Sequence, residues 1–64
     1  MYIFNDDEFN HVKLESESYQ QSIEEIKDRF NIKGWPIARY LGTNYVFYAL
    51  DDSDYWFVIT RIDD

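Results

Sequence analysis

The fold of this chain is decided by the stretch YVFYALDDSDYWFVITRI, residues 45–62. It holds two runs of β-branched and aromatic residues, which favour strands, on either side of the acidic segment DDSD. Asp and Ser favour turns because their side chains bond to the nearby backbone. We therefore expect a hairpin of two strands, 45–50 and 55–62. The cross-strand pairs that it predicts are Leu50 with Tyr55, Tyr48 with Phe57, and Val46 with Ile59.

Further strands are indicated upstream of this hairpin. Residues 37–41 favour a third strand, joined to the hairpin through the turn segment 42–44, so that the C-terminal half forms an antiparallel meander. Nearer the N-terminus, residues 1–4 and 9–14 favour one or two short strands around a polar break at 5–8.

Between these regions lies the clearest helical pattern of the chain. Ser18 followed by Gln21 is a capping-box start, and Gly34 and Pro36 provide a stop. We expect a helix over 18–31. The apolar residues that repeat at helical spacing are Tyr19, Ile23, Ile26 and Phe30. The sequence thus predicts a single α+β domain over 1–64, with one amphipathic helix packed on an antiparallel sheet of three to five strands.

The meander is apolar on both faces, although a sheet with one solvated face should alternate apolar with polar residues. One face carries Tyr48, Tyr55, Phe57, Ile59 and Arg61, with Arg39 beside Arg61. The other carries Tyr45, Phe47, Ala49, Trp56, Val58, Thr60 and Ile62.

One helix cannot cover both of these faces. Because Ala49 is small and lets a helix approach closely, we expect the helix on its face, against Phe47, Trp56 and Val58. The opposite face is then either a binding surface, since Tyr and Arg are enriched at interface hot spots, or core that the N-terminal segment covers.

The acidic balance restricts the partners. With 13 acidic and 6 basic residues the formal charge is −7, which disfavours nucleic acid and anionic lipid as direct partners and favours basic protein surfaces, including those that hold nucleic acid. The chain has no cysteine, no signal-peptide pattern and no long apolar run, so we expect a cytoplasmic protein without a membrane segment.

The acids fall into five groups, which could imitate the phosphate track of a duplex or could be solvated charges that keep the protein soluble. Within the helix, Glu25 can pair with Arg29 one turn on. The partner-binding residues predicted from the aromatic face and the acidic groups are Tyr48, Tyr55, Phe57, Arg61, Arg39, Asp51, Asp52, Asp54, Glu24 and Asp28.

Residues that could perform catalysis are scarce. His11 is the single histidine, there is no cysteine, and no G-x-S-x-G elbow or Gly-rich phosphate loop occurs. The acids at 51–54 lack the register of an EF-hand, so a hairpin turn explains them better than a cation site. We predict no enzymatic activity, cofactor or metal.

These observations favour a small inhibitor or regulator that binds another protein. In general character the chain is similar to the compact acidic inhibitors that bacteriophages use against host defence nucleases, anti-CRISPR proteins among them, which would place it in the host cytoplasm. The likeness is one of size, charge and aromatic content and involves no motif. Alternatives are an antitoxin or immunity protein, and an oligomeric small-ligand binder in which Trp35 and Trp56 stack on the ligand. A two-fold homodimer is a separate prediction.

Overall fold

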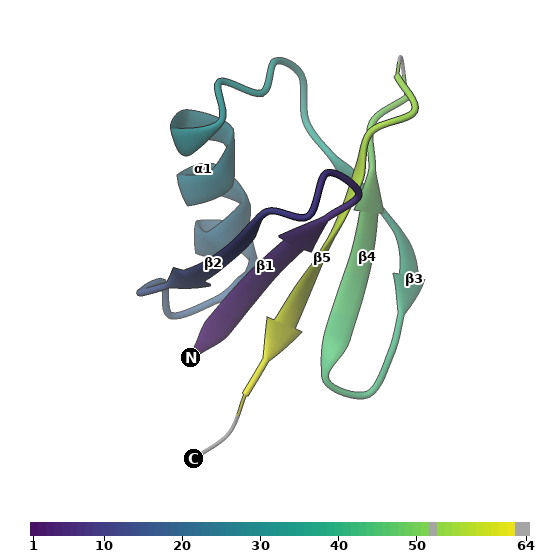
Figure 1. Ribbon diagram of the computed structural model, residues 1–64. Coiled ribbons are helices and arrows are strands. Elements are labelled where there is room, and N and C mark those ends of the chain that lie inside the picture. Colours follow the sequence, from purple (N-terminus) through teal and green to yellow (C-terminus); the bar gives the residue numbers. More distant parts are fainter. Residues whose placement is uncertain (52, 63–64) are drawn as a thin grey trace.

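A computed structural model describes residues 1–51 and 53–62 of the chain. They form five strands and one helix, arranged as a single antiparallel sheet in the order β2-β1-β5-β4-β3 with α1 against it (Figure 1). The α+β class and the C-terminal meander are thereby confirmed. The elements are β1 (Tyr2–Asp6), β2 (His11–Leu14), α1 (Tyr19–Arg29), β3 (Ile37–Leu41), β4 (Tyr45–Ala49) and β5 (Trp56–Arg61).

The two N-terminal strands extend the meander. β1 pairs with β2 on one side and with β5 on the other, so that Phe4 lies opposite both Val12 and Ile59. The first and last strands of the chain are therefore neighbours in the middle of the sheet. The backbone N–H of Ile62 also donates to the carbonyl of Met1 at 2.8 Å.

The C-terminal hairpin has the predicted register. Tyr48 pairs with Phe57 and Val46 with Ile59. The β3–β4 pairing is interrupted, because the register shifts between Ala38 and Tyr40. This β-bulge at Arg39 places Ala38 opposite Tyr48, and not on the face of Ala49 as a regular tight hairpin would.

The helix begins as predicted and ends earlier. The Ser18 side chain caps it by accepting from the N–H of Gln21 at 3.2 Å. Its last regular residue is Arg29, because Asn31 takes the left-handed conformation at φ 54° and the N–H of Ile32 bonds back to the Lys27 carbonyl. The left-handed residue that stops the helix is thus Asn31, the predicted end, and Gly34 follows it in the connection to β3.

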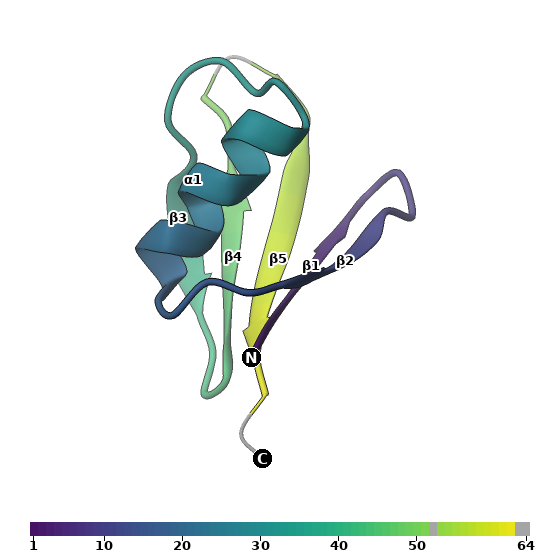
Figure 2. The same cartoon turned by 90° about the vertical axis from the view of Figure 1, so that its left-hand side faces the viewer.

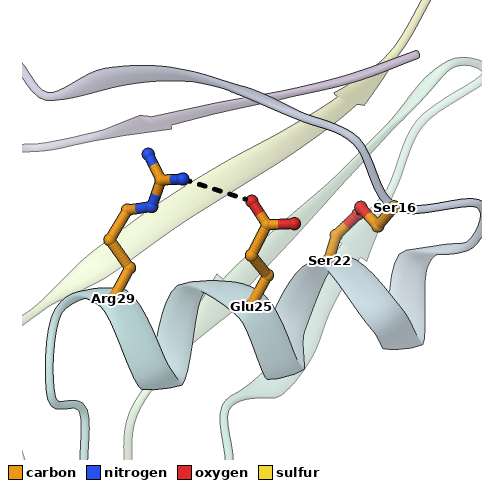
Figure 3. A network of polar contacts seen from close by, with 4 residues as sticks. All are labelled: Ser16, Ser22, Glu25 and Arg29. Carbon is orange, nitrogen blue, oxygen red and sulfur yellow. Dashed lines mark hydrogen bonds and ion pairs between the residues drawn. The ribbon is translucent and has the colours of Figure 1, made fainter.

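Two polar contacts involve the helix, one with the segment before it and one within it (Figure 3). The hydroxyls of Ser16 and the fully buried Ser22 are 2.6 Å apart, which ties the segment before the helix to its first turns. Arg29 lies 3.6 Å from Glu25 and forms the predicted pair one turn apart. Both residues of that pair are partly exposed, so it contributes little to stability.

The helix packs on the face of the sheet opposite to the predicted one (Figures 1 and 2). Phe57 and Ile59 are fully buried under it together with Ile26. The core consists of Tyr2, Phe4, Leu14, Ile23, Ile26, Val46, Tyr48, Phe57 and Ile59. The expectation that the helix covers Phe47, Trp56 and Val58 is wrong.

The N-terminal strands explain which face is inside. Tyr2, Phe4 and Leu14 point to the same side as Phe57 and Ile59, because Phe4 pairs with Ile59 in the sheet. Most apolar side chains of β1 and β2 lie on this side, since the other side of these strands carries Ile3 together with the polar residues Asn5, His11 and Lys13. The helix therefore buries the most apolar surface on the face of Phe57, and the small size of Ala49 does not decide its position.

Candidate functional site

The structure divides the predicted binding residues among different environments. Tyr48 and Phe57 are buried in the core, so the aromatic face predicted as an interface is the one that the helix covers. Burial raises the pKa of the Tyr48 hydroxyl, with a smaller contribution from Tyr19. This face belongs to the core, as the alternative expected, but the helix covers it. The N-terminal strands extend the sheet beside it and do not fold across it.

The other predicted residues that the structure describes lie on the surface, apart from the half-buried Tyr55, and are not gathered in one place. Arg39 and Asp51 form an exposed ion pair at 2.6 Å, while Arg61 is exposed at the end of β5. Those on the exposed side of the helix are Glu24 and Asp28, and Asp54 is exposed in the turn before β5. Asp52 and the acids at 63 and 64 lie outside the described residues.

The outer face of the sheet, on the side away from α1, is left uncovered by the described part of the chain (Figure 1). We call it the open face, and its outward residues are Ile3, Asn5, His11, Lys13, Ile37, Tyr40, Tyr45, Phe47, Ala49, Trp56, Val58 and Thr60. Stacked aromatic pairs lie along it: Phe47 with Trp56 at 5.4 Å, and Tyr40 with Tyr45 at 5.8 Å between ring centroids. Tyr40 is 58% exposed and Trp56 is 37% exposed.

Electrostatics distinguish the open face from the rest of the surface. The outward residues include no acidic side chain and one full cation, Lys13, on the edge strand β2. His11 lies beside it, with Nδ1 2.6 Å from the side-chain oxygen of Asn5. The pKa of Tyr45 lies above its ordinary value, chiefly because its hydroxyl interacts with that of Tyr40. The open face is therefore apolar and aromatic over β3, β4 and β5, mostly polar over β1 and β2, and without a carboxylate among these outward residues.

The loop between β1 and β2 has a different character. We call residues 6–10 the acidic hairpin, with Asp7 and Glu8 exposed on it. Its Phe9 side chain is 97% exposed, and the Phe9 backbone takes the left-handed conformation at φ 65°. A bulky residue is rare at positive φ, so the chain presents an apolar side chain to solvent from a strained position.

Asp6 holds the acidic hairpin in shape. One carboxylate oxygen accepts from the backbone N–H groups of Glu8 at 3.0 Å and Asn10 at 2.8 Å. The other accepts from the Asn10 amide at 2.8 Å and the Tyr55 hydroxyl at 2.7 Å. Burial alone would raise the pKa of Asp6, but these hydrogen bonds outweigh it and hold the pKa below its ordinary value.

A shallow pocket of about 340 Å³ opens beside Asp6. It is lined by Asp6, Glu8, Asn10, Phe30, Asn31, Ile32, Lys33, Leu50 and Tyr55. Burial, and then the bond to Asp6, raise the pKa of Tyr55 far above its ordinary value. Since both Asp6 oxygens are engaged and Tyr55 stays protonated, neither group is suited to general acid or base catalysis, and both serve the structure.

The tryptophans proposed as ligand platforms both contact other side chains of the chain. Trp35 lies in the connection between α1 and β3, with the Lys27 ammonium 4.9 Å from its ring centroid. Lys27 also donates to the Gly34 carbonyl, which fixes this connection to the helix. Trp56 stacks on Phe47 in the open face.

Within residues 1–51 and 53–62, no three side chains of the metal-binding types come together, and no helix has the length and apolar character needed to cross a bilayer. Comparison with family models, with curated proteins and with solved structures finds no match to this chain. The candidate sites are therefore the two surfaces described above, the open face and the acidic hairpin.

Proposed function

We propose that this chain is a small protein-binding inhibitor or regulator that docks through its acidic hairpin on a basic protein surface, of the kind that also holds nucleic acid. The observation that carries the proposal is Phe9, exposed at the tip of a hairpin that a buried carboxylate holds in place. The function is of the class that the acidic, aromatic sequence favours, but the contact surface is the acidic hairpin and not the face of Tyr48 and Phe57.

The position of Phe9 is costly for the isolated protein. A non-glycine residue in the left-handed region costs on the order of 1–2 kcal/mol. A phenyl ring left in water also gives up the roughly 1.5–3 kcal/mol that burial would contribute. The ring touches no core residue that would offset these costs, since it is almost fully exposed. A contact with another molecule would offset them.

The surroundings of Phe9 indicate the chemistry of the partner. Asp7 and Glu8 precede it and are exposed, and Lys33 is the basic residue that lines the adjoining pocket. An aromatic anchor rimmed by carboxylates complements an apolar pocket rimmed by Lys or Arg. Basic proteins that handle nucleic acid have such surfaces, and the overall charge of −7 would steer the encounter.

Two more specific functions would use the same contact through Phe9 and the acidic hairpin. An anti-defence inhibitor of the phage type and an antitoxin or immunity protein would both block a basic site with acidic and aromatic groups. A small-ligand binder has less support, because the pocket is open to solvent and lined by Asp6 and Glu8, which would repel nucleotide phosphates. A toxin gene adjacent to this one would favour the antitoxin form.

The proposal is tested by photo-crosslinking from position 9. A benzophenone amino acid replaces Phe9 in one protein and the exposed helix residue Gln20 in a control, and both are used for capture from a host lysate at low salt. We expect a basic protein to crosslink from position 9 and not from position 20. The Phe9→Ala variant should bind the captured protein at least about tenfold more weakly, and added salt should weaken the complex further.

Two outcomes would contradict the proposal. One is crosslinking that is no stronger from position 9 than from position 20. The other is a captured complex whose affinity changes neither with Phe9→Ala nor with salt. Circular dichroism of the variant protein confirms that loss of binding does not reflect loss of fold.

A further inference from the structure

The open face calls for an explanation independent of the acidic hairpin. It joins the outward side chains of all five strands, and the described chain places its helix on the other side (Figures 1 and 2). Exposed apolar patches of this kind on a small protein usually mark an interaction site. The chemistry of the face decides which occupant suits it.

The charges of the open face disfavour a basic partner and are compatible with a second copy of this chain. A basic surface would find no carboxylate among the outward residues, and it would meet Lys13. The acids of the described chain lie in other places: in the acidic hairpin, on Glu15 and Glu17, on the helix, and in the turn after Leu50. Two copies that approach open face to open face therefore keep the carboxylates of the described residues away from the contact, although each molecule has a net charge of −7, and Lys13 lies on the edge strand β2, away from the centre of the face.

The edges of the sheet favour contact between faces over pairing between edges. Edge strand β3 is interrupted by the bulge at Arg39, and edge strand β2 has four residues. Bulged and short edges resist the addition of a further strand. Two sheets can instead pack face to face at about 10 Å, with strands crossing at about 30°.

The side chains of the open face suit such packing. Along the strands, small residues alternate with large ones across the pairs Ala49 with Trp56 and Thr60 with Tyr45. Large groups of one copy can then fit over small groups of the other, as interdigitating sandwich cores require. A two-fold axis through the face makes the contact self-complementary and closed at two copies.

The size of the face sets the expected strength. Five strands spaced about 4.8 Å apart, with about five residues each at about 3.4 Å, present a flat area of roughly 400 Å² per copy. This is about half of the roughly 800 Å² that each partner buries in a standard specific interface, so the association should be weak and depend on concentration. We propose that the chain forms a two-fold homodimer by packing two open faces into a β-sandwich, with the helices on the outside.

The test is the molar mass in solution, measured by sedimentation equilibrium from about micromolar to millimolar protein. The monomer has a mass of 7.8 kDa, and we expect the average mass to rise to twice that value and no further. Thr60→Glu adds a carboxylate on the central strand β5 and should weaken the dimer at least about tenfold, because the two new charges oppose each other. Gln20→Glu adds the same charge on the exposed side of the helix and should leave the dimer unchanged.

A second variant covers the case in which Thr60→Glu does not fold. Tyr45→Thr removes a partly exposed ring without adding charge and keeps a strand-favouring residue, so it should also weaken the dimer. A monomeric mass throughout the range, or a dimer that both folded variants leave intact, overturns the proposal. Since neither variant alters the acidic hairpin, these results are independent of the crosslinking from position 9.

Discussion

The two faces of the sheet are built from the same strands and the same kinds of residue, yet one is sealed and the other is open. Phe57 is fully buried beneath the helix, whereas Phe47 on the neighbouring strand points outward and is only half-buried. Hydrophobicity of the individual strands does not distinguish them. The difference arises from β1 and β2, which add Tyr2, Phe4 and Leu14 to one side and mostly polar residues to the other. In so small a domain, the neighbours of a strand decide which of its sides is core.

A matched pair of Phe→Ala substitutions tests the difference between the two faces with the largest expected effect. Phe57→Ala should lower the free energy of unfolding by about 3–5 kcal/mol, because it leaves a cavity in the core. For a chain of this length that is a large part of the total stability. Phe47→Ala should cost about 1 kcal/mol, since its ring is already partly in water. Urea unfolding at micromolar protein measures both, and equal losses would mean that the faces are not different.

A smaller effect is expected at the rim of the sealed face, where Tyr55 bonds to Asp6. Tyr55→Phe removes one donor to a carboxylate in a partly buried position and should lower the free energy of unfolding by about 1–2 kcal/mol. In an Asp6→Asn background the same substitution should cost less, because the charged acceptor is gone. An unchanged cost in the double-mutant cycle would show that the bond contributes nothing.

The pH dependence of the free energy of unfolding tests the role of Asp6 at the rim of the sealed face. The pKa of Asp6 is lower in the folded protein than its ordinary value of 3.8, so the folded state binds the proton less readily than the unfolded state. Its contribution is therefore fully present above that ordinary value and is lost as the pH falls through the lower pKa of the folded protein. Wild-type protein should lose more stability than Asp6→Asn between pH 5 and about pH 2.5. Parallel losses in urea titrations would contradict this.

The smallest effect should have the opposite sign and concerns Phe9, which belongs to neither face. Phe9→Asn should raise the free energy of unfolding by up to about 1 kcal/mol, because Asn tolerates the left-handed backbone that Phe9 adopts. Phe9→Val is the matched control and should lower stability, since a β-branched residue fits that conformation worst. Thermal unfolding of the three proteins checks the order Asn, Phe, Val. Any other order would argue against strain at this position.

Much of the fold could be predicted from the sequence because its signals are local. The helix start at Ser18, the turn after Leu50 and the register of Tyr48 against Phe57 each depend on a few adjacent residues. The position of the helix could not be derived in this way. It depends on the pairing of β1 with β5, a contact between opposite ends of the chain, and on the bulge at Arg39 that moves Ala38 away from the face of Ala49.

The candidate sites were harder to predict for the same reason. The aromatic residues chosen for binding, Tyr48 and Phe57, form core because the helix lies over them. Phe9 was overlooked, although an apolar residue between Glu8 and Asn10, in a turn that begins with Asp6, is a local signal of a presented side chain. Its exposure and positive φ become apparent only when the hydrogen bonds of Asp6 are known.

The pairing of β1 with β5 also fixes the order in which the molecule can be assembled. The bonded residues Met1 and Ile62 are 61 positions apart, whereas the hairpins within each half close over short loops. Hairpins form within microseconds, while joining distant segments is slower because the intervening chain must be restrained. At translation rates of about 5–20 residues per second, β1 therefore waits for several seconds with one edge unpaired until β5 leaves the ribosome. The sheet can therefore close only after β5 has emerged.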